Sequence, residues 1–292
     1  MLSDEIIVTG SRAIARSYAK INLTLDVLGR RNNGYHDVEM IMQTVSLFDL
    51  LIIDKSNGGI KISTNLGYLP SNEKNIAYKA ALAFFDYTNI KGSVRIIIHK
   101  NIPVAAGLAG GSGNAAAVLC ALDKLYGTGL SEKQLCEIGL TLGADVPFCI
   151  MGNTALAQGI GEILTPLPEA PKMTILLVKP PVNISTASIY ELIDNEPLKK
   201  RPDTSAMISA LENKNISEIA SNLYNVMEDV TGKLCPVVGG IKKKMLMNGA
   251  QGAVMSGSGP TVFGIFNDYQ TAKKSHDSFA YQYRDVFLAN TI

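Results

Sequence analysis

A glycine-rich segment that runs into an alanine-rich stretch constrains this sequence more than any other feature. Residues 107–113 read Gly-Leu-Ala-Gly-Gly-Ser-Gly and continue directly into Asn-Ala-Ala-Ala-Val-Leu-Cys-Ala-Leu. The alanine-rich stretch predicts a helix, whereas each glycine inside a helix costs about 1 kcal/mol relative to alanine. We therefore expect residues 103–113 to form a loop that leads into the N-terminus of a helix.

Such a loop is suited to binding phosphate. Glycine lets backbone N–H groups approach an anion closely, and a helix N-terminus adds unpaired N–H groups and a partial positive charge. We expect this segment to hold the polyphosphate of ATP, with the hydroxyl group of Ser112 available to a phosphate or to Mg²⁺. The residues of the predicted loop are Pro103, Val104, Ala105, Ala106, Gly107, Leu108, Ala109, Gly110, Gly111, Ser112 and Gly113. The structural alternative is a flexible turn before a packed helix.

Two other phosphate-binding patterns fit less well. The sequence contains no G-x-x-x-x-G-K-[ST] segment, so a Walker A loop is excluded. Gly111, Gly113 and Ala116 satisfy the G-x-G-x-x-A spacing of a dinucleotide fold. That pattern requires a strand immediately before it, and residues 101–110 intervene here.

The composition excludes several classes of partner. The chain has 292 residues, of which 27 are basic and 26 acidic, and its formal net charge is +1. This charge gives no electrostatic attraction for nucleic acid or an anionic membrane. The cysteines at positions 120, 136, 149 and 235 have no C-x-x-C spacing, which favours small buried side chains in a reducing compartment. Without a signal-peptide pattern or a long apolar run, we expect a cytoplasmic protein.

The pattern along the chain predicts an α+β protein with two lobes. Prolines at positions 166, 168 and 171 crowd one connection, where we place a boundary between domains 1–170 and 171–292. Strands and helices are mixed without a regular βαβ order. Strands are predicted at 13–28, 38–53, 94–99, 173–179 and 261–266, and helices at 72–86, 114–125, 131–142, 186–193, 204–211 and 237–248.

Three segments in the same order resemble the GHMP kinases. Pro103–Ser112 resembles their P-x-x-x-G-L-G/A-G-G-S loop, Tyr18–Leu23 their N-terminal strand, and Met255–Thr261 their C-terminal glycine loop. The resemblance implies an N-terminal lobe like ribosomal protein S5 domain 2 and a ferredoxin-like C-terminal lobe. It also implies a kinase that uses ATP and Mg²⁺ and acts on a small molecule.

Two further segments resemble one branch of this family. Gly34-Tyr35-His36 and Gly143–Phe148 are similar to segments of the GHMP kinases that phosphorylate the 2-hydroxyl of a cytidine-diphosphate-linked methylerythritol, in non-mevalonate isoprenoid synthesis. The resemblance therefore implies this substrate. A GHMP kinase for mevalonate or homoserine, and a nucleotide-binding module without catalysis, stay open as alternatives. Monomer and homodimer are both compatible with the sequence.

The resemblance singles out Lys20 and Asp145 as a catalytic pair. A carboxylate and an ammonium group in apolar surroundings are each costly unless they are paired, so each is the natural partner of the other. Asp145 would accept the proton of the substrate hydroxyl, while Lys20 would orient it and stabilise phosphoryl charge. Asn22 lies on the same strand face as Lys20 and could bond the hydroxyl or the carboxylate. A structural ion pair is the alternative.

The resemblance also implies the residues that bind each nucleotide. Tyr35, His36 and Tyr190 would hold the cytosine, and Thr186 would lie near the ribose or a phosphate. Lys100 and Asn75 would lie near the adenine of ATP. The alternative is ordinary surface packing for Tyr35 and His36, and a solvated strand end for Lys100. One departure from many relatives is Asn at position 114, where they have Asp, so the ligands of Mg²⁺ stay open.

Overall fold

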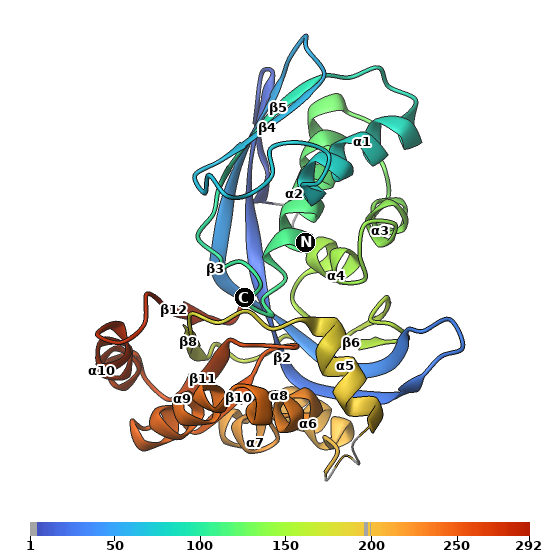
Figure 1. Cartoon of the computed structure of the whole chain (residues 1–292). Helices are drawn as coiled ribbons and strands as arrows, with labels where there is room; N and C mark the ends of the chain where they lie inside the picture. The colour runs from blue at the N-terminus through green and yellow to red at the C-terminus, as the bar shows by residue number, and fades with distance from the viewer. Residues whose placement is uncertain (1–4, 196–197, 199) are drawn as a thin grey trace. The chain divides into compact units, whose positions relative to one another are not determined.

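The computed structural model describes residues 5–195, 198 and 200–292 (Figure 1). These residues form two compact units, each assembled from three stretches of the chain. The first unit comprises the chain up to residue 19 together with 48–104 and 109–152, and the second comprises 20–47, 105–108 and 153–292. A single boundary at residue 170, which divides 1–170 from 171–292, stays a prediction for the lobes of the family.

The first unit combines a sheet with four helices. Within it the end of β3 (His36–Lys55) pairs antiparallel with β5 (Val94–His99), and β4 (Ile60–Thr64) pairs parallel with β5. β1 (Ile7–Thr9) pairs with the start of β2 (Arg12–Arg30). The helices, which lie on one side of the strands in Figure 1, are α1 (Ile76–Thr88), α2 (Gly110–Tyr126), α3 (Glu132–Leu140) and α4 (Asp145–Met151).

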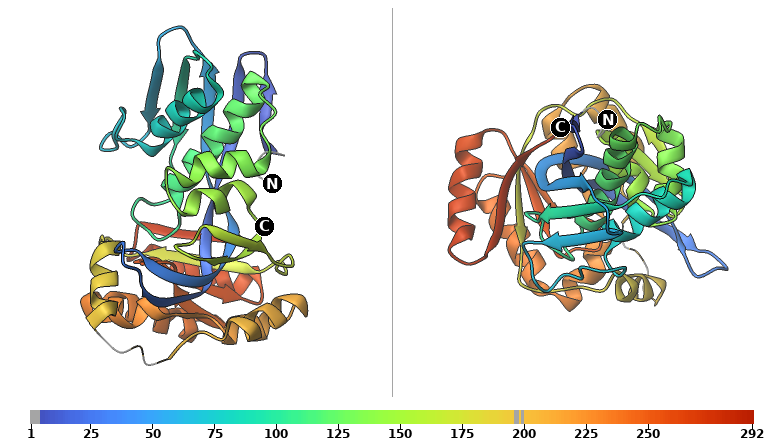
Figure 2. Two further views of the ribbon diagram at one scale, coloured as in Figure 1. Left: turned by 90° about the vertical axis from the view of Figure 1, so that its right-hand side faces the viewer. Right: turned by 90° about the horizontal axis from the view of Figure 1, so that it is seen from above.

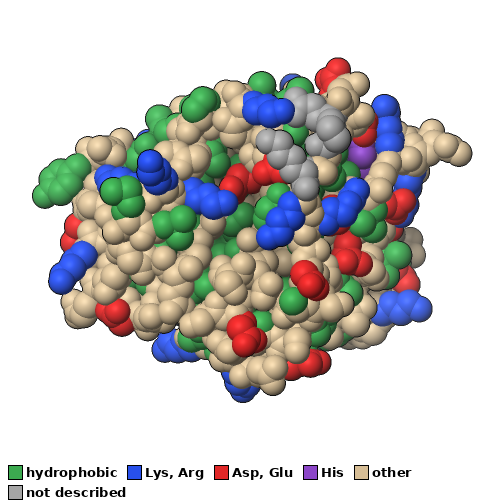
Figure 3. All heavy atoms as spheres, turned by 90° about the horizontal axis from the view of Figure 1, so that it is seen from below, with side chains coloured by type: hydrophobic (Ala, Val, Ile, Leu, Met, Phe, Trp, Pro, Cys, Tyr) green, Lys and Arg blue, Asp and Glu red, His purple; other side chains and the backbone are tan. Residues whose placement is uncertain are grey.

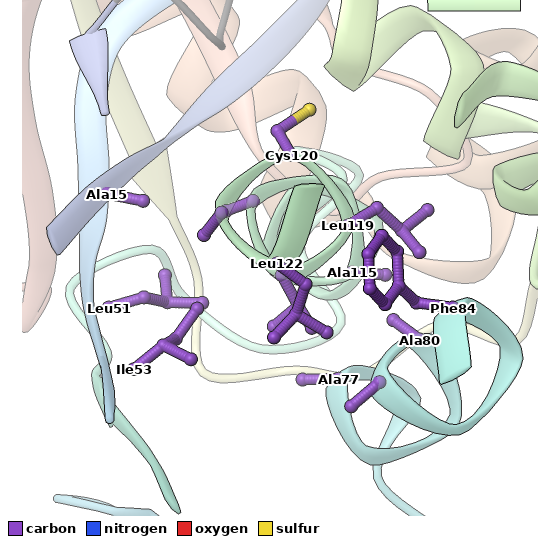
Figure 4. Packing of buried hydrophobic residues seen from close by; sticks show 14 of the residues in the cluster. Ala15, Leu51, Ile53, Ala77, Ala80, Phe84, Ala115, Leu119, Cys120 and Leu122 are labelled. Carbon is purple, nitrogen blue, oxygen red and sulfur yellow. The ribbon is translucent and has the colours of Figure 1, made fainter. Parts of the chain in front are cut away.

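Helix α2 is the centre of the first unit's core. Every residue from Gly113 to Leu122 is buried, and a helix that is buried all round must pack against neighbours on each face. Small side chains permit this, since Ala115 of α2 and Ala77 and Ala80 of α1 belong to one cluster (Figure 4). Cys120 lies in the same cluster, and burial raises the pKa of its thiol to about 12, consistent with the predicted small buried side chain.

The start of α2 differs from the prediction. The helix begins at Gly110 rather than after Gly113, so three glycines lie in its first turn. A Cβ atom on Gly113 would lie 2.6 Å from the Oγ atom of Ser17, and one on Gly110 would lie 2.9 Å from the Cγ2 atom of Ile102. Because the first turn packs so closely on β2 and on the preceding loop, glycine is required there despite its low helix propensity.

The second unit contains a four-stranded antiparallel sheet. Its order is β10–β11–β8–β12, with β8 (Thr174–Lys179) between β11 (Val262–Phe266) and β12 (Asp285–Asn290). β10 (Gly252–Met255) forms one edge. α9 (Pro236–Met247) contacts β10 and β11, while α10 (Tyr269–Ala280) contacts β8 and β12 (Figure 2).

Shorter elements complete the second unit. β6 (Thr154–Gln158) pairs with residues 40–43 of β3 and with β7 (Ile163–Pro166), and β9 (Tyr224–Asn225) pairs with β2. Its other helices are α5 (Thr186–Asn195), α6 (Thr204–Glu212), α7 (Ile216–Ser221) and α8 (Val226–Leu234). On the face shown in Figure 3, acidic and basic side chains are interspersed.

Most predicted elements are confirmed, with ends that differ by a few residues. The start of α3 is fixed by a capping box formed by Ser131 and Gln134. Within the part of the chain that the structure describes, none of the helices combines the length and apolarity needed to cross a membrane.

Candidate active site

The first turn of α2 presents unpaired backbone donors in the first unit. The first helical bond runs from the N–H of Gly113 to the carbonyl of Ala109, at 2.8 Å. The N–H groups of Gly110, Gly111 and Ser112 precede that bond, so the helix leaves them available for a ligand. Together with the helix dipole they form a local anion-binding feature.

The preceding residues 105–108 belong to the second unit, where they contact the other two family motifs. The backbone N–H of Lys20 donates to the carbonyl of Leu108 at 3.2 Å, and the Oγ of Ser256 donates to the carbonyl of Gly107 at 2.9 Å. Gly107 has a φ of +72°, and a Cβ atom there would lie 2.1 Å from the carbonyl oxygen of Ser256. The three motifs noted in the sequence therefore meet at Gly107 and Leu108.

Asn225 supports the C-terminal glycine loop and was missed by the sequence reasoning. Its Nδ2 donates to the carbonyls of Met255 and Gly257, both at 2.8 Å, and its Oδ1 accepts from the N–H of Met227 at 2.9 Å. The side chain thus caps α8 and holds the loop with one amide group. An asparagine directly before a helical stretch was the available signal.

Lys20 and Asn22 lie together on one face of β2, as their spacing predicts. Both side chains are buried, and the Nζ of Lys20 donates to the Oδ1 of Asn22 at 2.7 Å. The Nδ2 of Asn22 lies 3.1 Å from the Sδ of Met40. The amide of Asn22 therefore orients the ammonium group of Lys20.

Asp145 is the first residue of α4 in the first unit. It is half-buried, and a carboxylate in the first turn of a helix is stabilised by the helix dipole. α4 packs against α2. Since Lys20 belongs to the second unit, the Lys20–Asp145 pair stays a prediction.

An aromatic stack in the second unit joins two of the residues expected at the cytosine. The rings of His36 and Tyr190 lie 4.4 Å apart between centroids, with an angle of 12° between their planes. The Nε2 of His36 lies 2.7 Å from the Oδ1 of Asp194. A carboxylate only accepts hydrogen bonds, so Nε2 carries the proton in this pair. Arg30 approaches the other oxygen of Asp194 at 3.4 Å.

Asp194 was not predicted from the sequence. It lies four residues after Tyr190 in α5, on the same helical face. The spacing could have suggested that it accompanies Tyr190, but its partner His36 is 158 residues away. Tyr35 is 60% exposed, so its expected contact with cytosine stays a prediction. Thr186 shares a hydrogen bond with Ser258, at 2.7 Å between the two hydroxyl oxygens.

The two residues expected near the adenine have structural partners. Asn75 caps α1, accepting from the N–H of Ala77 at 3.0 Å and donating to the carbonyl of Pro70 at 2.8 Å. Lys100 is buried and forms an ion pair with Asp49. Contacts of Asn75 and Lys100 with adenine stay predictions.

Comparisons with known proteins agree with these motifs. The model described as "GHMP kinases N terminal domain" matches residues 75–153, and "GHMP kinases C terminal" matches residues 207–285. A 4-diphosphocytidyl-2-C-methyl-D-erythritol kinase of Clostridium novyi (strain NT) is 46% identical over 95% of this chain and 99% of its own length. One of Caldicellulosiruptor saccharolyticus is 50% identical, over 95% and 96%. The chain belongs to this family of GHMP kinases.

Solved structures place the fold in the same family. A crystal structure of 4-(cytidine 5'-diphospho)-2C-methyl-D-erythritol kinase is 30% identical with a TM-score of 0.83, and covers 95% of this chain and 98% of its own. A homoserine kinase from Cytophaga hutchinsonii is 20% identical, covers 98% and 96%, and has a TM-score of 0.75, which shows a shared fold. The predicted α+β GHMP kinase fold is confirmed.

The residues near the start of α2 fit Mg²⁺ held jointly with phosphates. Among the residues that the structure describes, no group of three or more His, Cys, Asp or Glu could hold a metal ion. Mg²⁺ is usually bound by one or two carboxylates together with phosphate oxygens of the substrate. Ser112, which is half-buried in the first turn of α2, supplies a hydroxyl group and stays the candidate protein ligand. The carboxylate that would accompany it stays open.

Proposed function

We propose that this chain transfers the γ-phosphoryl group of ATP to the 2-hydroxyl of 4-diphosphocytidyl-2-C-methyl-D-erythritol, in non-mevalonate isoprenoid synthesis. The proposal rests above all on relatives of that name, which are 46% and 50% identical over nearly the whole chain. The N-terminus of α2 and the His36–Tyr190 pair supply chemistry suited to a polyphosphate and a base. Mevalonate and homoserine stay the alternative acceptors, although the homoserine kinase structure described above is only 20% identical to this chain.

In this proposal the N–H groups of Gly110, Gly111 and Ser112 hold phosphate oxygens of ATP. Residues 103–109 lead the backbone to that position, and Ser112 adds a hydroxyl group. Mg²⁺, when bound, would neutralise phosphate charge, with Ser112 as its candidate protein ligand. Asn75 and Lys100 stay candidate residues near the adenine.

The transfer itself requires a proton acceptor. The oxygen of the 2-hydroxyl attacks the γ-phosphorus, the bond from that phosphorus to the oxygen of ADP breaks, and the hydroxyl proton passes to Asp145. Lys20 would stabilise the charge that develops on the phosphoryl oxygens. Its hydrogen bond to Asn22, at 2.7 Å, restricts where its ammonium group can point.

Cytidine recognition is assigned to the second unit. The proton on Nε2 of His36 leaves Nδ1 as a hydrogen-bond acceptor in the neutral ring, which suits the exocyclic amino group of cytosine. Tyr190 offers an aromatic face for stacking, and Tyr35 is a second candidate. The present His36–Tyr190 stack must rearrange if the base is to lie between two aromatic rings.

The proposal also covers the cellular compartment, the binding partners and the oligomeric state of the protein. We place the reaction in the cytoplasm, supported by the buried thiols of Cys120 and Cys235. The partners would be small molecules rather than nucleic acid or membrane. A monomer and a homodimer both stay possible forms of the active enzyme.

One assay tests the proposal directly. ADP release is measured with ATP, Mg²⁺ and, in separate reactions, the cytidine substrate, mevalonate and homoserine. Turnover with the cytidine substrate, inhibited by CDP, is expected. Turnover with mevalonate or homoserine in the absence of CDP binding would point to another GHMP kinase, and ATP binding without turnover would point to a nucleotide-binding module.

A further inference from the structure

A buried carboxylate in the first unit uses both of its oxygens. The Oδ1 of Asp49 accepts from the N–H groups of Asn101 and Ile102, both at 2.8 Å. Its Oδ2 accepts from the Nδ2 of Asn114 at 2.8 Å and forms an ion pair with Lys100. The side chains of Asp49 and Lys100 are 0% and 5% exposed. The carboxylate of Asp49 and its ion pair with Lys100 are therefore shielded from water, and charge-assisted hydrogen bonds are strong in such surroundings.

The partners of Asp49 lie at the two ends of residues 103–113, the segment proposed to bind phosphate. Asn101 and Ile102 precede residues 103–113, and Asn114 follows them. One carboxylate thus holds both ends of that segment. We call Asp49, Lys100, Asn114 and Ser17 the loop-end cluster, since Lys100 also donates to the Oδ1 of Asn114 at 3.1 Å, and Asn114 donates to the Oγ of Ser17 at 3.1 Å.

The cluster gives a physical reason for asparagine at position 114. Its amide must donate to Asp49 and accept from Lys100 at the same time. An aspartate there would bring a second carboxylate oxygen to about the same 2.8 Å from the Oδ2 of Asp49. Two buried carboxylates at that distance repel each other strongly. Asp49 therefore favours a neutral side chain at position 114.

We propose that Asp49 is a positioning residue for ATP, which acts by holding both ends of residues 103–113 in the conformation that presents the first-turn N–H groups of α2. The inference rests on the proposed function, in that this segment is taken to bind ATP. Preformed donors bind a ligand more tightly than donors that must first be ordered. Loss of the hydrogen bonds made by Asp49 should therefore weaken ATP binding. Cytidine binding, which is assigned to the second unit, should not change.

The test compares single and swapped variants. Asp49→Asn leaves two amides and no carboxylate beside Lys100, and Asn114→Asp leaves two carboxylates and no amide. The double variant exchanges the carboxylate and the amide and so keeps one of each. The dissociation constants of ATP and of CDP are measured by calorimetry on the full chain. Each single variant should bind ATP about 10- to 100-fold more weakly, the expected effect of losing one charge-assisted bond. The double variant should recover at least tenfold of that loss, and CDP binding should stay within twofold.

Asp54→Asn is the matched control, because Asp54 lies on the same strand and is paired with Arg12 and Arg95 rather than with the segment. ATP binding within twofold of wild type is expected for it. Equal loss of ATP and CDP affinity in Asp49→Asn, or a double variant no better than the singles, would overturn the inference. If the single variants do not fold, the double variant decides: recovery of ATP binding supports the inference, and an unfolded double variant refutes it. A wild-type chain that binds no ATP would instead refute the proposed function.

Discussion

The N-terminus of α2 in the first unit and the His36–Tyr190 pair in the second unit are built from different kinds of groups. The first consists of backbone N–H groups supported by the loop-end cluster, in which Asp49 is 0% exposed. The second consists of side chains, and Asp194, which orients His36, is 25% exposed. A backbone site held from inside suits a ligand common to many enzymes, while a side-chain site near solvent can be adapted to one substrate.

The largest expected effect comes from the residue proposed to take the proton. Asp145→Asn keeps the shape of the side chain but removes its basicity, so kcat should fall by about 10²- to 10⁴-fold. The dissociation constants of ATP and CDP should change little, because neither binding region depends on that proton transfer. Steady-state kinetics together with calorimetry checks this. A variant that retains full turnover would remove Asp145 from the mechanism.

The second-largest effect tests whether the His36–Tyr190 pair binds cytosine. Tyr190→Ala removes the stacking face and should raise the KM of the cytidine substrate roughly tenfold to a hundredfold, with a smaller change in kcat. Tyr190→Phe is the matched control, since it keeps the aromatic face. If both variants leave KM unchanged, or if kcat falls as far as KM rises, Tyr190 is a packing residue.

A smaller effect is expected for the residue that orients His36. Asp194→Asn weakens the 2.7 Å bond that keeps the proton on Nε2, so the affinity for CDP should fall roughly threefold to tenfold. Arg30→Ala removes a 3.4 Å contact of an exposed side chain to the same carboxylate and should change affinity less than twofold. Similar losses in the two variants would mean that charge near the stack matters more than the orientation of His36.

The smallest effect concerns stability and pH in the first unit. Hydrogen bonds from Arg12 and Arg95 lower the pKa of Asp54 from 3.8 to about 2. Its stabilising contribution is therefore complete above the unfolded pKa and is lost as the pH falls through the folded one. Urea unfolding of wild type and Asp54→Asn should differ by at most about 1 kcal/mol at pH 7, because both arginines are half exposed and solvent screens their charges. The difference should shrink by about half at pH 3, and a difference that does not depend on pH would contradict this.

The sequence predicted the glycine-rich segment and the helix after it better than the residues that hold them in place. The glycine segment, the alanine-rich helix and the same-face placement of Lys20 and Asn22 follow from local patterns. The start of α2 at Gly110 did not follow from such patterns. Glycine is required there because Ser17 and Ile102 lie too close for a side chain, whatever the helix propensity. Lys100 was read as a candidate adenine contact, and nothing near it in the sequence indicated its buried partner Asp49.

The His36–Tyr190 pair and its surroundings were predictable only in part. The family resemblance indicated His36 and Tyr190, which the structure brings together. Asp194 and Asn225 act on residues far from them in the sequence, and their roles follow from tertiary contacts that periodicity does not encode. A single sequence reveals a pattern when its residues are neighbours, and it leaves out partners that only folding brings together.

The order of strands in the second unit has a consequence for biosynthesis. β8, whose last five residues are all buried, lies between β11 and β12, and β12 begins only at Asp285. On the ribosome, at about 5–20 residues per second, β8 must wait on the order of ten seconds before both of its neighbours exist. During that interval an apolar, β-forming segment has unsatisfied edges, which is the condition under which nascent chains associate with one another. Chaperone dependence in the cell would then be expected to originate at Thr174–Lys179 rather than at either of the regions proposed to bind nucleotides.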